Sequence, residues 1–406
     1  MIGKKIKMDR THQVFEHTVL RFEPGRQGYE EWFTQRHLEA MVDYHDNRGG
    51  SKYFKLVRSG VQFSQYVGVM QVLDLTIEIL PKTDRSESKS DWHNVLLSML
   101  RQTRFLQLNY ISEASLRYKK YSILHLYFQE YINQVRGLVR KGLIRKYRKK
   151  EGNLPALKGS LKFNQHINQN LVHKERFYTK HQVYDHNHLI HQVLYKALGI
   201  IQSLTKNSFI TDDLNRLLFE FPEMPFVNVT EKTFEKIHLD RKSSSYSKAL
   251  EIAKMIILNY SPDIKGGRND LFALLFDMNE LWEEYIYRQL IASGYSVKYQ
   301  DSQLFWKLRR MRPDMVVNID GENQIVDAKW KIVNNAQPSD EDLRQVFAYN
   351  IYWGAKKGFL VYPKTSLSPI ASPGYYHKGH TSDEKMSCQV VYVDALENDN
   401  KLKITL

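Results

Sequence analysis

The sequence is short of cysteine and of long apolar runs. Cys388 is the single cysteine among 406 residues, which excludes an internal disulfide framework and a cysteine-built zinc site and fits a reducing compartment. No apolar run reaches the roughly eighteen residues that mark a membrane helix, and residues 1–20 carry charges where a signal peptide needs an apolar stretch. We therefore expect a soluble protein that is not exported, does not enter a membrane and resides in the cytoplasm.

The chain also lacks a glycine-rich phosphate loop, an internal repeat and any motif for a serine or cysteine nucleophile. Nucleotide hydrolysis by this chain is therefore not expected. Apolar side chains are not scarce: they make up 42% of the residues, and aromatic ones 12%, which is enough to build buried cores. A chain of this length suggests two or three folded domains.

Positive charge is in excess, because 59 lysines and arginines face 45 aspartates and glutamates, a net charge of +14. Such a surplus attracts phosphate backbones through counterion release, so nucleic acid is the leading partner. The densest basic cluster spans residues 136–150, which hold eight basic residues and no acid. Within it we predict that Arg145, Lys146, Arg148 and Lys149 contact DNA; the alternative is a solvated helix end with an apolar stripe.

Patterns along the chain predict a multidomain protein of the α+β and α/β classes. Residues 57–82 are rich in valine, isoleucine and aromatics and predict hairpin-type β structure. Apolar spacing predicts helices over 92–108 and 121–147, a connector over 150–163 and a helical block over about 185–260. We expect a β-rich and helical N-terminal region at 1–150, a helical middle at 151–265 and a C-terminal domain at 266–406.

The C-terminal domain shows a different pattern. After a helix over 271–293, alternation with a period of two predicts strands. The strands are expected at 295–300, 303–310, 313–319 and 324–333, followed by a helix at 340–353 and a strand at 358–362. This order indicates a mixed sheet flanked by helices.

The candidate catalytic residues lie on either side of Asp320-Gly321. Asp320-Gly321 is a strong turn signal between two apolar runs and predicts a hairpin. Side chains two apart in a strand share a face, so Asp327 and Lys329 point the same way, and the hairpin brings Asp314 beside them. Two acids and a lysine are therefore expected to converge at the end of a sheet.

This cluster suits a hard divalent cation. Carboxylates of Asp314 and Asp327 with the backbone carbonyl of Ala328 are ligands that Mg²⁺ prefers, with Mn²⁺ as a substitute. A cation held there lowers the pKa of bound water and neutralises charge on a phosphoryl group, while Lys329 orients the water or stabilises the transition state. Phosphodiester hydrolysis is the predicted reaction. The alternative is an ordinary exposed hairpin with a salt bridge.

Pro313-Asp314, followed after twelve residues by Asp327-Ala328-Lys329, resembles the signature of the PD-(D/E)xK nucleases. The resemblance implies a C-terminal nuclease fold in which a mixed sheet is flanked by helices. It also implies that the two aspartates hold the metal and that the lysine assists the attacking water.

Two flanking features strengthen this resemblance. Glu283 matches the acid that such folds carry on the helix before the sheet, although Glu280 and Glu284 lie on the same helix. Gln345 and Tyr349 match the QxxxY motif on the helix after the sheet, and the resemblance implies that they position the lysine or the DNA backbone. Simpler roles remain open: a cap or bridge for Gln345, and core packing for Tyr349.

The order of motifs over residues 55–362 is similar to that of McrC, the nuclease subunit of the McrBC modification-dependent restriction system. The segments that carry this similarity are 66–70, 77–82, 142–147, 157–161 and 276–279. Membership implies a Mg²⁺-dependent endonuclease that cleaves double-stranded DNA and stimulates a hexameric AAA+ GTPase of the McrB type, in defence against phage. The alternatives are a non-catalytic activator of that partner and a stand-alone nuclease of transposition or repair.

The N-terminal region is expected to dock on the partner. Residues 46–52 form a polar stretch ahead of the β-rich segment, the best candidate for a projecting loop. Arg48 and Lys52 are the residues there that can reach a nucleotide phosphate across an interface. A plain surface turn is the competing interpretation.

Three histidines invite a zinc interpretation, because His188 and His191 would share a helical face near His186. Asp185 as the N-cap of a helix with a polar first turn is the simpler account, and we prefer it.

Overall fold

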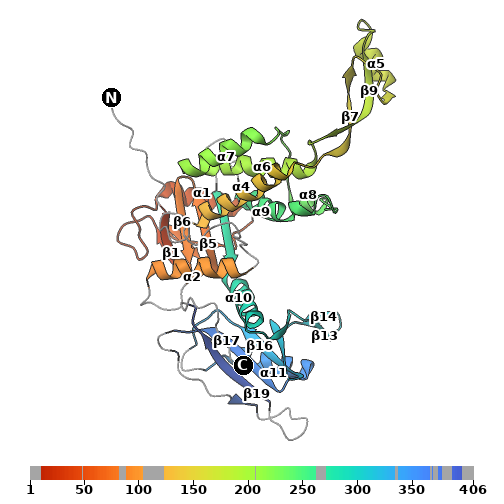
Figure 1. Ribbon diagram of the computed structural model, residues 1–406. Helices are drawn as coiled ribbons and strands as arrows, with labels where there is room; N and C mark the ends of the chain where they lie inside the picture. Colours follow the sequence, from red (N-terminus) through yellow and green to blue (C-terminus); the bar gives the residue numbers. More distant parts are fainter. Residues whose placement is uncertain are drawn as a thin grey trace. The chain divides into compact units, whose positions relative to one another are not determined.

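The computed structural model describes residues 11–47, 49–81, 88–103, 123–205, 207–261, 271–333, 337–365, 368, 374–376 and 386–395. The chain forms two compact units (Figure 1). One combines residues 1–109 with 262–406, and the other consists of residues 110–261. The expected boundaries were 150 and 265, so the first unit unites segments that the sequence placed in separate domains. In the part of the chain that the structure describes, no helix is long and apolar enough to cross a membrane.

The N-terminal part of the first unit is built on two sheets. In one, β1 (Thr11–Phe15), β6 (Leu75–Leu80), β5 (Tyr66–Val72) and β11 (Leu271–Asp277) lie in that order. In the other, β2 (Val19–Arg21), β4 (Gly60–Phe63) and β3 (Phe54–Val57) are antiparallel. The helices α1 (Gln35–Asn47) and α2 (Lys89–Gln102) accompany them. The β structure predicted over 57–82 and the helix predicted near Trp92 are confirmed.

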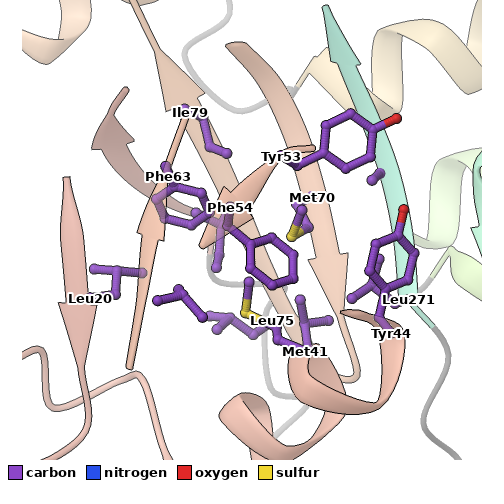
Figure 2. Close-up of a cluster of buried hydrophobic side chains, with 14 of the residues drawn as sticks. Leu20, Met41, Tyr44, Tyr53, Phe54, Phe63, Met70, Leu75, Ile79 and Leu271 are labelled. Atoms are coloured by element: carbon purple, nitrogen blue, oxygen red, sulfur yellow. The ribbon is translucent and has the colours of Figure 1, made fainter. Parts of the chain in front are cut away.

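A single apolar cluster holds these sheets together. Figure 2 shows side chains from both sheets and from α1 meeting in this cluster, among them Leu20, Met41, Phe54, Met70 and Leu271. Each of the five is at most 1% exposed, and fully burying such a side chain contributes about 1.5–3 kcal/mol. The cluster therefore ties β11, from far along the chain, to the N-terminal strands.

The prediction of one helix over 271–293 is wrong at its beginning. Residues 271–277 form β11, which pairs antiparallel with β5, and α10 covers only Met278–Ala292. Asp277 caps α10 by accepting a hydrogen bond from the backbone N–H of Asn279. The first six residues of β11 are all buried, so the strand has no polar alternation and its apolar run resembles a continuation of the helix.

The C-terminal part of the first unit contains a six-stranded sheet. Its order is β12 (Ser296–Tyr299), β15 (Met315–Ile319), β16 (Glu322–Ala328), β17 (Lys357–Pro363), β19 (Ser387–Val393) and β18 (Gly374–Tyr375). β16, β17 and β19 are parallel, whereas β12, β15 and β16 form an antiparallel meander. A separate hairpin joins β13 (Gln303–Trp306) to β14 (Arg309–Met311). The helix predicted at 340–353 is α11 (Asp340–Trp353), and the turn at Asp320-Gly321 is confirmed.

The second unit combines helices with a β ribbon. Its helices are α4 (Ile123–Lys141), α5 (Phe163–Asn170), α6 (Leu189–Leu204), α7 (Ser208–Glu220), α8 (Glu231–Glu235), the 3-10 helix η1 (Ser244–Tyr246) and α9 (Ser247–Asn259). Its strands are β7 (Lys146–Leu154), β8 (Ser160–Leu161), β9 (Phe177–Asp185) and the short β10 (Tyr260–Ser261). The helical block predicted at 185–260 is present as α6 to α9.

Two predictions in this unit are wrong. The helix expected over 121–147 ends at Lys141, because Gly142 takes a positive φ of 86° that terminates it. Half of the connector expected over 150–163 is strand, since β7 continues to Leu154 and β8 covers Ser160–Leu161. β7 pairs with β9 along its whole length, and α5 packs against β9 (Figure 1). β7 is rich in lysine and has no apolar alternation, so pairing and not sequence pattern defines it.

Candidate active site

The hairpin of β15 and β16 brings the two aspartates and the lysine together. Met315 pairs with Val326 in the antiparallel register, which places Asp314 beside Asp327. Oδ2 of Asp314 accepts a hydrogen bond from the backbone N–H of Ala328 at 2.9 Å. Nζ of Lys329 lies 2.8 Å from Oδ2 of Asp327. The cluster expected from the alternation of side chains is therefore present at the end of β16.

Burial dominates the electrostatics of the cluster. Asp327 is 0% exposed, and burial raises its pKa while the Lys329 ammonium opposes the rise. Burial also raises the pKa of Asp314 well above its ordinary value, and the charges of Asp327 and Glu283 add to this. Burial works to lower the pKa of Lys329, but the two aspartates outweigh it and the pKa is raised. The site thus places two buried carboxyl groups with raised pKa values beside a lysine whose protonated form is favoured.

α10 contributes Glu283 to the same cluster. Burial raises the pKa of Glu283 to about 7, Lys329 opposes this shift, and Asp327 adds to it. Of its helix neighbours, Glu280 is exposed and Glu284 pairs with Arg288 at 2.9 Å. Glu283 is therefore the acid of this helix that shares the field of the cluster.

Gln300 also belongs to the site, although it was not among the residues predicted from the sequence. Its side chain makes a hydrogen bond that lowers the pKa of Glu283. Its backbone N–H donates to the carbonyl oxygen of Asp314 at 2.8 Å. A non-glycine residue at a φ of 50° is uncommon, but no sequence motif announces such a conformation.

Gln345 and Tyr349 act on the backbone next to the site. Nε2 of Gln345 donates to the hydroxyl of Tyr349 at 2.8 Å, and that hydroxyl donates to the carbonyl oxygen of Arg312 at 3.1 Å. Arg312 is two residues before Asp314. The described contacts therefore make these side chains positioning groups for the chain that enters the site.

The residues present fit a hard divalent cation. Apart from the ion pair with Lys329, both carboxylate oxygens of Asp327 are buried and lack a hydrogen bond among the described residues. Nowhere in the described ranges do three His, Cys, Asp or Glu side chains gather so that they could hold a metal. A cation here would depend on the carboxylates of Asp314 and Asp327, the carbonyl of Ala328 and water, a donor set typical of Mg²⁺.

Further contacts brace the end of β16. The indole N–H of Trp330 donates to Oε1 of Glu16 at 2.8 Å, and its ring packs against those of Trp92 and Trp282. Trp330 thus faces away from Asp327 and Lys329, as the alternation predicts. Nζ of Lys331 lies 2.6 Å from Oδ2 of Asp342 on α11.

The predicted DNA-contacting residues lie in the second unit, at the start of the ribbon of β7 and β9. Nε of Arg145 donates to His186 at 3.2 Å, and Arg148 forms a two-atom ion pair with Asp185. Lys146 begins β7. Lys149 lines an open hollow of about 520 Å³ together with Lys158 and Lys180. Because these residues belong to a strand, Lys146 and Arg148 lie on one face of it and Lys149 on the other. They do not share the face of a helix, which was the alternative considered for this segment.

Arg48 and Lys52 are the two residues predicted to activate a partner. Arg48 lies outside the described residues. Lys52 is exposed, and its ammonium lies 5.3 Å from the ring centres of both Tyr53 and Tyr66.

His186, His188 and His191 lie at the start of α6, where Asp185 was predicted to be the N-cap. Asp185 ends β9, and the N-cap of α6 is His188, so the N-cap prediction for Asp185 is wrong. His191 is buried and contacts the carbonyl oxygen of His186 and the hydroxyl of Tyr246. Burial lowers the pKa of His191 to about 3, which keeps it neutral in this polar core.

The described chain is thus a mixed α/β protein with two aspartates and a lysine clustered at the end of its C-terminal sheet. The family model described as "McrBC 5-methylcytosine restriction system component" matches residues 61–363. The chain belongs to this family, which confirms the resemblance to McrC.

Two solved structures extend this comparison. A chain in a refined half-complex from a tetradecameric assembly of Thermococcus gammatolerans McrB AAA+ hexamers with bound McrC has a TM-score of 0.66 at 16% identity, with 96% of each chain covered. A chain of the Thermococcus gammatolerans McrBC complex has a TM-score of 0.49 at 17% identity, covering 71% of this chain and 90% of that one. No curated protein shows a significant match. The first likeness supports the mixed α/β fold.

Proposed function

We propose that this chain is the Mg²⁺-dependent endonuclease subunit of a McrBC-type restriction complex, with residues 278–393, from α10 to β19, containing a PD-(D/E)xK nuclease fold. One observation carries the proposal: the 2.8 Å contact of Lys329 with Asp327 while Asp314 is bound to the backbone between them. An ordinary surface salt bridge does not require buried carboxylates, whereas Asp327 is fully buried. Burying these carboxylates costs desolvation free energy, and a catalytic role at a phosphate group would account for their burial.

Asp314, Asp327 and the carbonyl of Ala328 would hold Mg²⁺, with Mn²⁺ as a substitute. The cation supplies acidity to water and positive charge to the phosphoryl oxygens. Lys329, held by Asp327, donates to the attacking water or to the phosphate. Glu283 closes the cluster from α10, and Gln345 and Tyr349 hold the backbone at Arg312.

The proposed partners are double-stranded DNA and a hexameric AAA+ GTPase of the McrB type. The similar Thermococcus gammatolerans chain belongs to an assembly described as McrB AAA+ hexamers with bound McrC. The net charge of +14 supports association with DNA. We assign stimulation of the GTPase to the N-terminal part of the first unit, with Lys52 and Arg48 as candidate contacts.

The test is DNA cleavage by the chain with its AAA+ partner, GTP and Mg²⁺. Asp327→Asn and Lys329→Ala should each reduce cleavage by at least about 100-fold, because they remove a proposed ligand and a charge at the reacting phosphate. Lys356→Ala is the matched control, since Lys356 makes an exposed ion pair with Glu322 in the same sheet region. EDTA should abolish cleavage, and Mg²⁺ or Mn²⁺ should restore it. Wild-type cleavage by Lys329→Ala would refute the site.

A further inference from the structure

The hairpin of β13 and β14 exposes a group of apolar side chains near its tip. Among the described strands, β13 and β14 pair with each other and not with the six-stranded sheet. Four large apolar side chains within five residues of this hairpin are exposed: Leu304 (59%), Phe305 (53%), Trp306 (54%) and Leu308 (92%). Exposed apolar side chains grouped in this way mark an interaction site more often than a free surface.

The charges around this tip identify the kind of partner. Residues 303–311 contain Lys307, Arg309 and Arg310 and no acid. Nζ of Lys307 lies 4.8 Å from the Trp306 ring centre, and the guanidinium of Arg309 lies 5.6 Å from it. The apolar side chains of Trp306 and Leu308 alternate with basic ones. Such a surface complements a polyanion that also has apolar surface. Duplex DNA offers both, as phosphates along its grooves and as sugar and base edges within them.

The base of the hairpin is fixed beside the candidate active site. Arg310 donates to the hydroxyl and carbonyl oxygens of Ser302, both at 3.1 Å, and the Phe305 ring packs edge-on against Tyr352 of α11 at 5.8 Å. The turn between β12 and the hairpin is held by the bond from the backbone N–H of Gln300 to the carbonyl oxygen of Asp314. The base is therefore anchored, whereas the tip at Lys307 and Leu308 projects.

Chain length limits how far the tip reaches from the chemistry. Leu308 precedes Asp314 by six residues, which span at most roughly 20 Å when extended. That distance corresponds to about six base pairs of duplex at 3.4 Å per step. A contact made by the tip would therefore fall close to the phosphate that the site cleaves.

We propose that the β13–β14 hairpin is a DNA-contacting wedge. Trp306 and Leu308 enter a groove and pack on sugars or base edges, while Lys307 and Arg309 pair with the flanking phosphates, within about six base pairs of the scissile bond. This proposal rests on the nuclease function proposed above and adds the element that holds the duplex in place.

Binding of a fluorescent 30-base-pair duplex by the full-length chain in EDTA tests the wedge without any cleavage. The double variant Trp306→Ala/Leu308→Ala should bind about tenfold more weakly, because it removes apolar surface that the groove would bury. Ile291→Ala, an exposed apolar residue of α10, is the matched control and should bind as wild type does. Lys307→Gln/Arg309→Gln should lower the slope of log affinity against log salt by about two, one for each lost phosphate contact.

The outcomes separate the wedge from the nuclease. Unchanged DNA binding and salt slope in both double variants would overturn the wedge, even if Lys329→Ala confirms the catalytic site. Weaker DNA binding by the wedge variants, with wild-type cleavage by Lys329→Ala, would overturn the nuclease site alone. A change of oligomeric state or of binding to anionic vesicles, with DNA affinity unaltered, would assign the tip to another partner and also overturn the wedge. Thermal unfolding checks folding, and Leu308→Ala alone, at a 92% exposed position, replaces the double variant if that fails to fold.

Discussion

The carboxylate of Asp314 is bound to the backbone N–H of Ala328, at 2.9 Å between Oδ2 and N. This bond joins the start of β15 to the end of β16, at the residue between Asp327 and Lys329. Asp314 therefore has two separable roles. Its oxygen satisfies a buried N–H, and its charge is available to a cation.

Replacing Asp314 by Asn should separate these roles. The amide oxygen of Asn can still accept from Ala328, so the free energy of unfolding should stay within about 1 kcal/mol of wild type, while cleavage is lost. Asp314→Ala leaves the N–H of Ala328 unsatisfied and should cost about 1–3 kcal/mol in addition. Denaturant unfolding in EDTA measures the difference. Equal stability of the Asn and Ala variants would show that the hydrogen bond is not important.

Tyr349→Phe tests positioning through the backbone. The variant loses the bond from the hydroxyl to Arg312 and the partner of Gln345, while the ring stays packed against Trp353. Stability should fall by about 1 kcal/mol, and cleavage should fall about tenfold, because the chain leading to Asp314 is less well held. Single-turnover cleavage and denaturation of the same preparations give both values. A normal cleavage rate with the same loss of stability would make Tyr349 a packing residue only.

Gly358→Ala tests the close approach of α11 to the sheet. A Cβ atom at Gly358 would lie 2.2 Å from Cγ1 of Val346, so the substitution should cost about 1–3 kcal/mol. Val346→Ala removes the clashing methyl groups, and the double variant should be more stable than the sum of the two single changes predicts. Denaturant unfolding of the four proteins completes the cycle. Strict additivity would contradict a direct contact between Gly358 of the strand and Val346 of the helix.

The sequence was informative where side-chain chemistry is local. Asp320-Gly321 turns the hairpin because both residues adopt positive φ, 52° and 87°, which the turn requires. The helix predicted at 340–353 agrees with α11, and in the structure Ser339 caps its beginning and Gly354 ends it at a φ of 62°. Alternation then placed Asp327 and Lys329 on one face.

The remaining features depend on partners that are distant in the sequence. β11 is a strand because β5 lies beside it, and Gly68 of β5 allows the carbonyl of Leu274 to come within 2.4 Å of the position that a Cβ would take. β7 depends on β9 in the same way. Gln300 lies in the site because its backbone adopts a positive φ and its N–H bonds the carbonyl oxygen of Asp314. None of these relationships leaves a local pattern in one sequence.

The ribbon of the second unit offers a comparison of two cations for DNA binding. Arg148 is paired with Asp185, which holds the pKa of that carboxyl below its ordinary value, whereas Lys149 is exposed beside the hollow. Lys149→Gln should therefore lower the salt slope of DNA binding by about one, and Arg148→Gln should change it less. Asp185→Asn should raise affinity by freeing the guanidinium. Equal effects of the two single substitutions would argue that the ion pair opens on DNA.

Substitutions of Lys52 and Asp314 should separate partner activation from cleavage. Lys52 lies over the rings of Tyr53 and Tyr66, and its ammonium remains exposed, so it can meet a phosphate or carboxylate across an interface. Lys52→Ala should lower stimulation of the AAA+ GTPase severalfold and should change folding stability by less than about 1 kcal/mol. Lys55 is an exposed lysine three residues away on β3, so Lys55→Ala is the control and should stimulate as wild type does.

Asp314→Asn should keep full stimulation of the GTPase while losing cleavage, because the Asp314 carboxylate is bound at the end of the C-terminal sheet. GTP hydrolysis by the partner, measured without DNA, distinguishes these variants. Loss of stimulation by Asp314→Asn, or full stimulation by Lys52→Ala, would remove the assignment of the two activities to separate parts of the first unit.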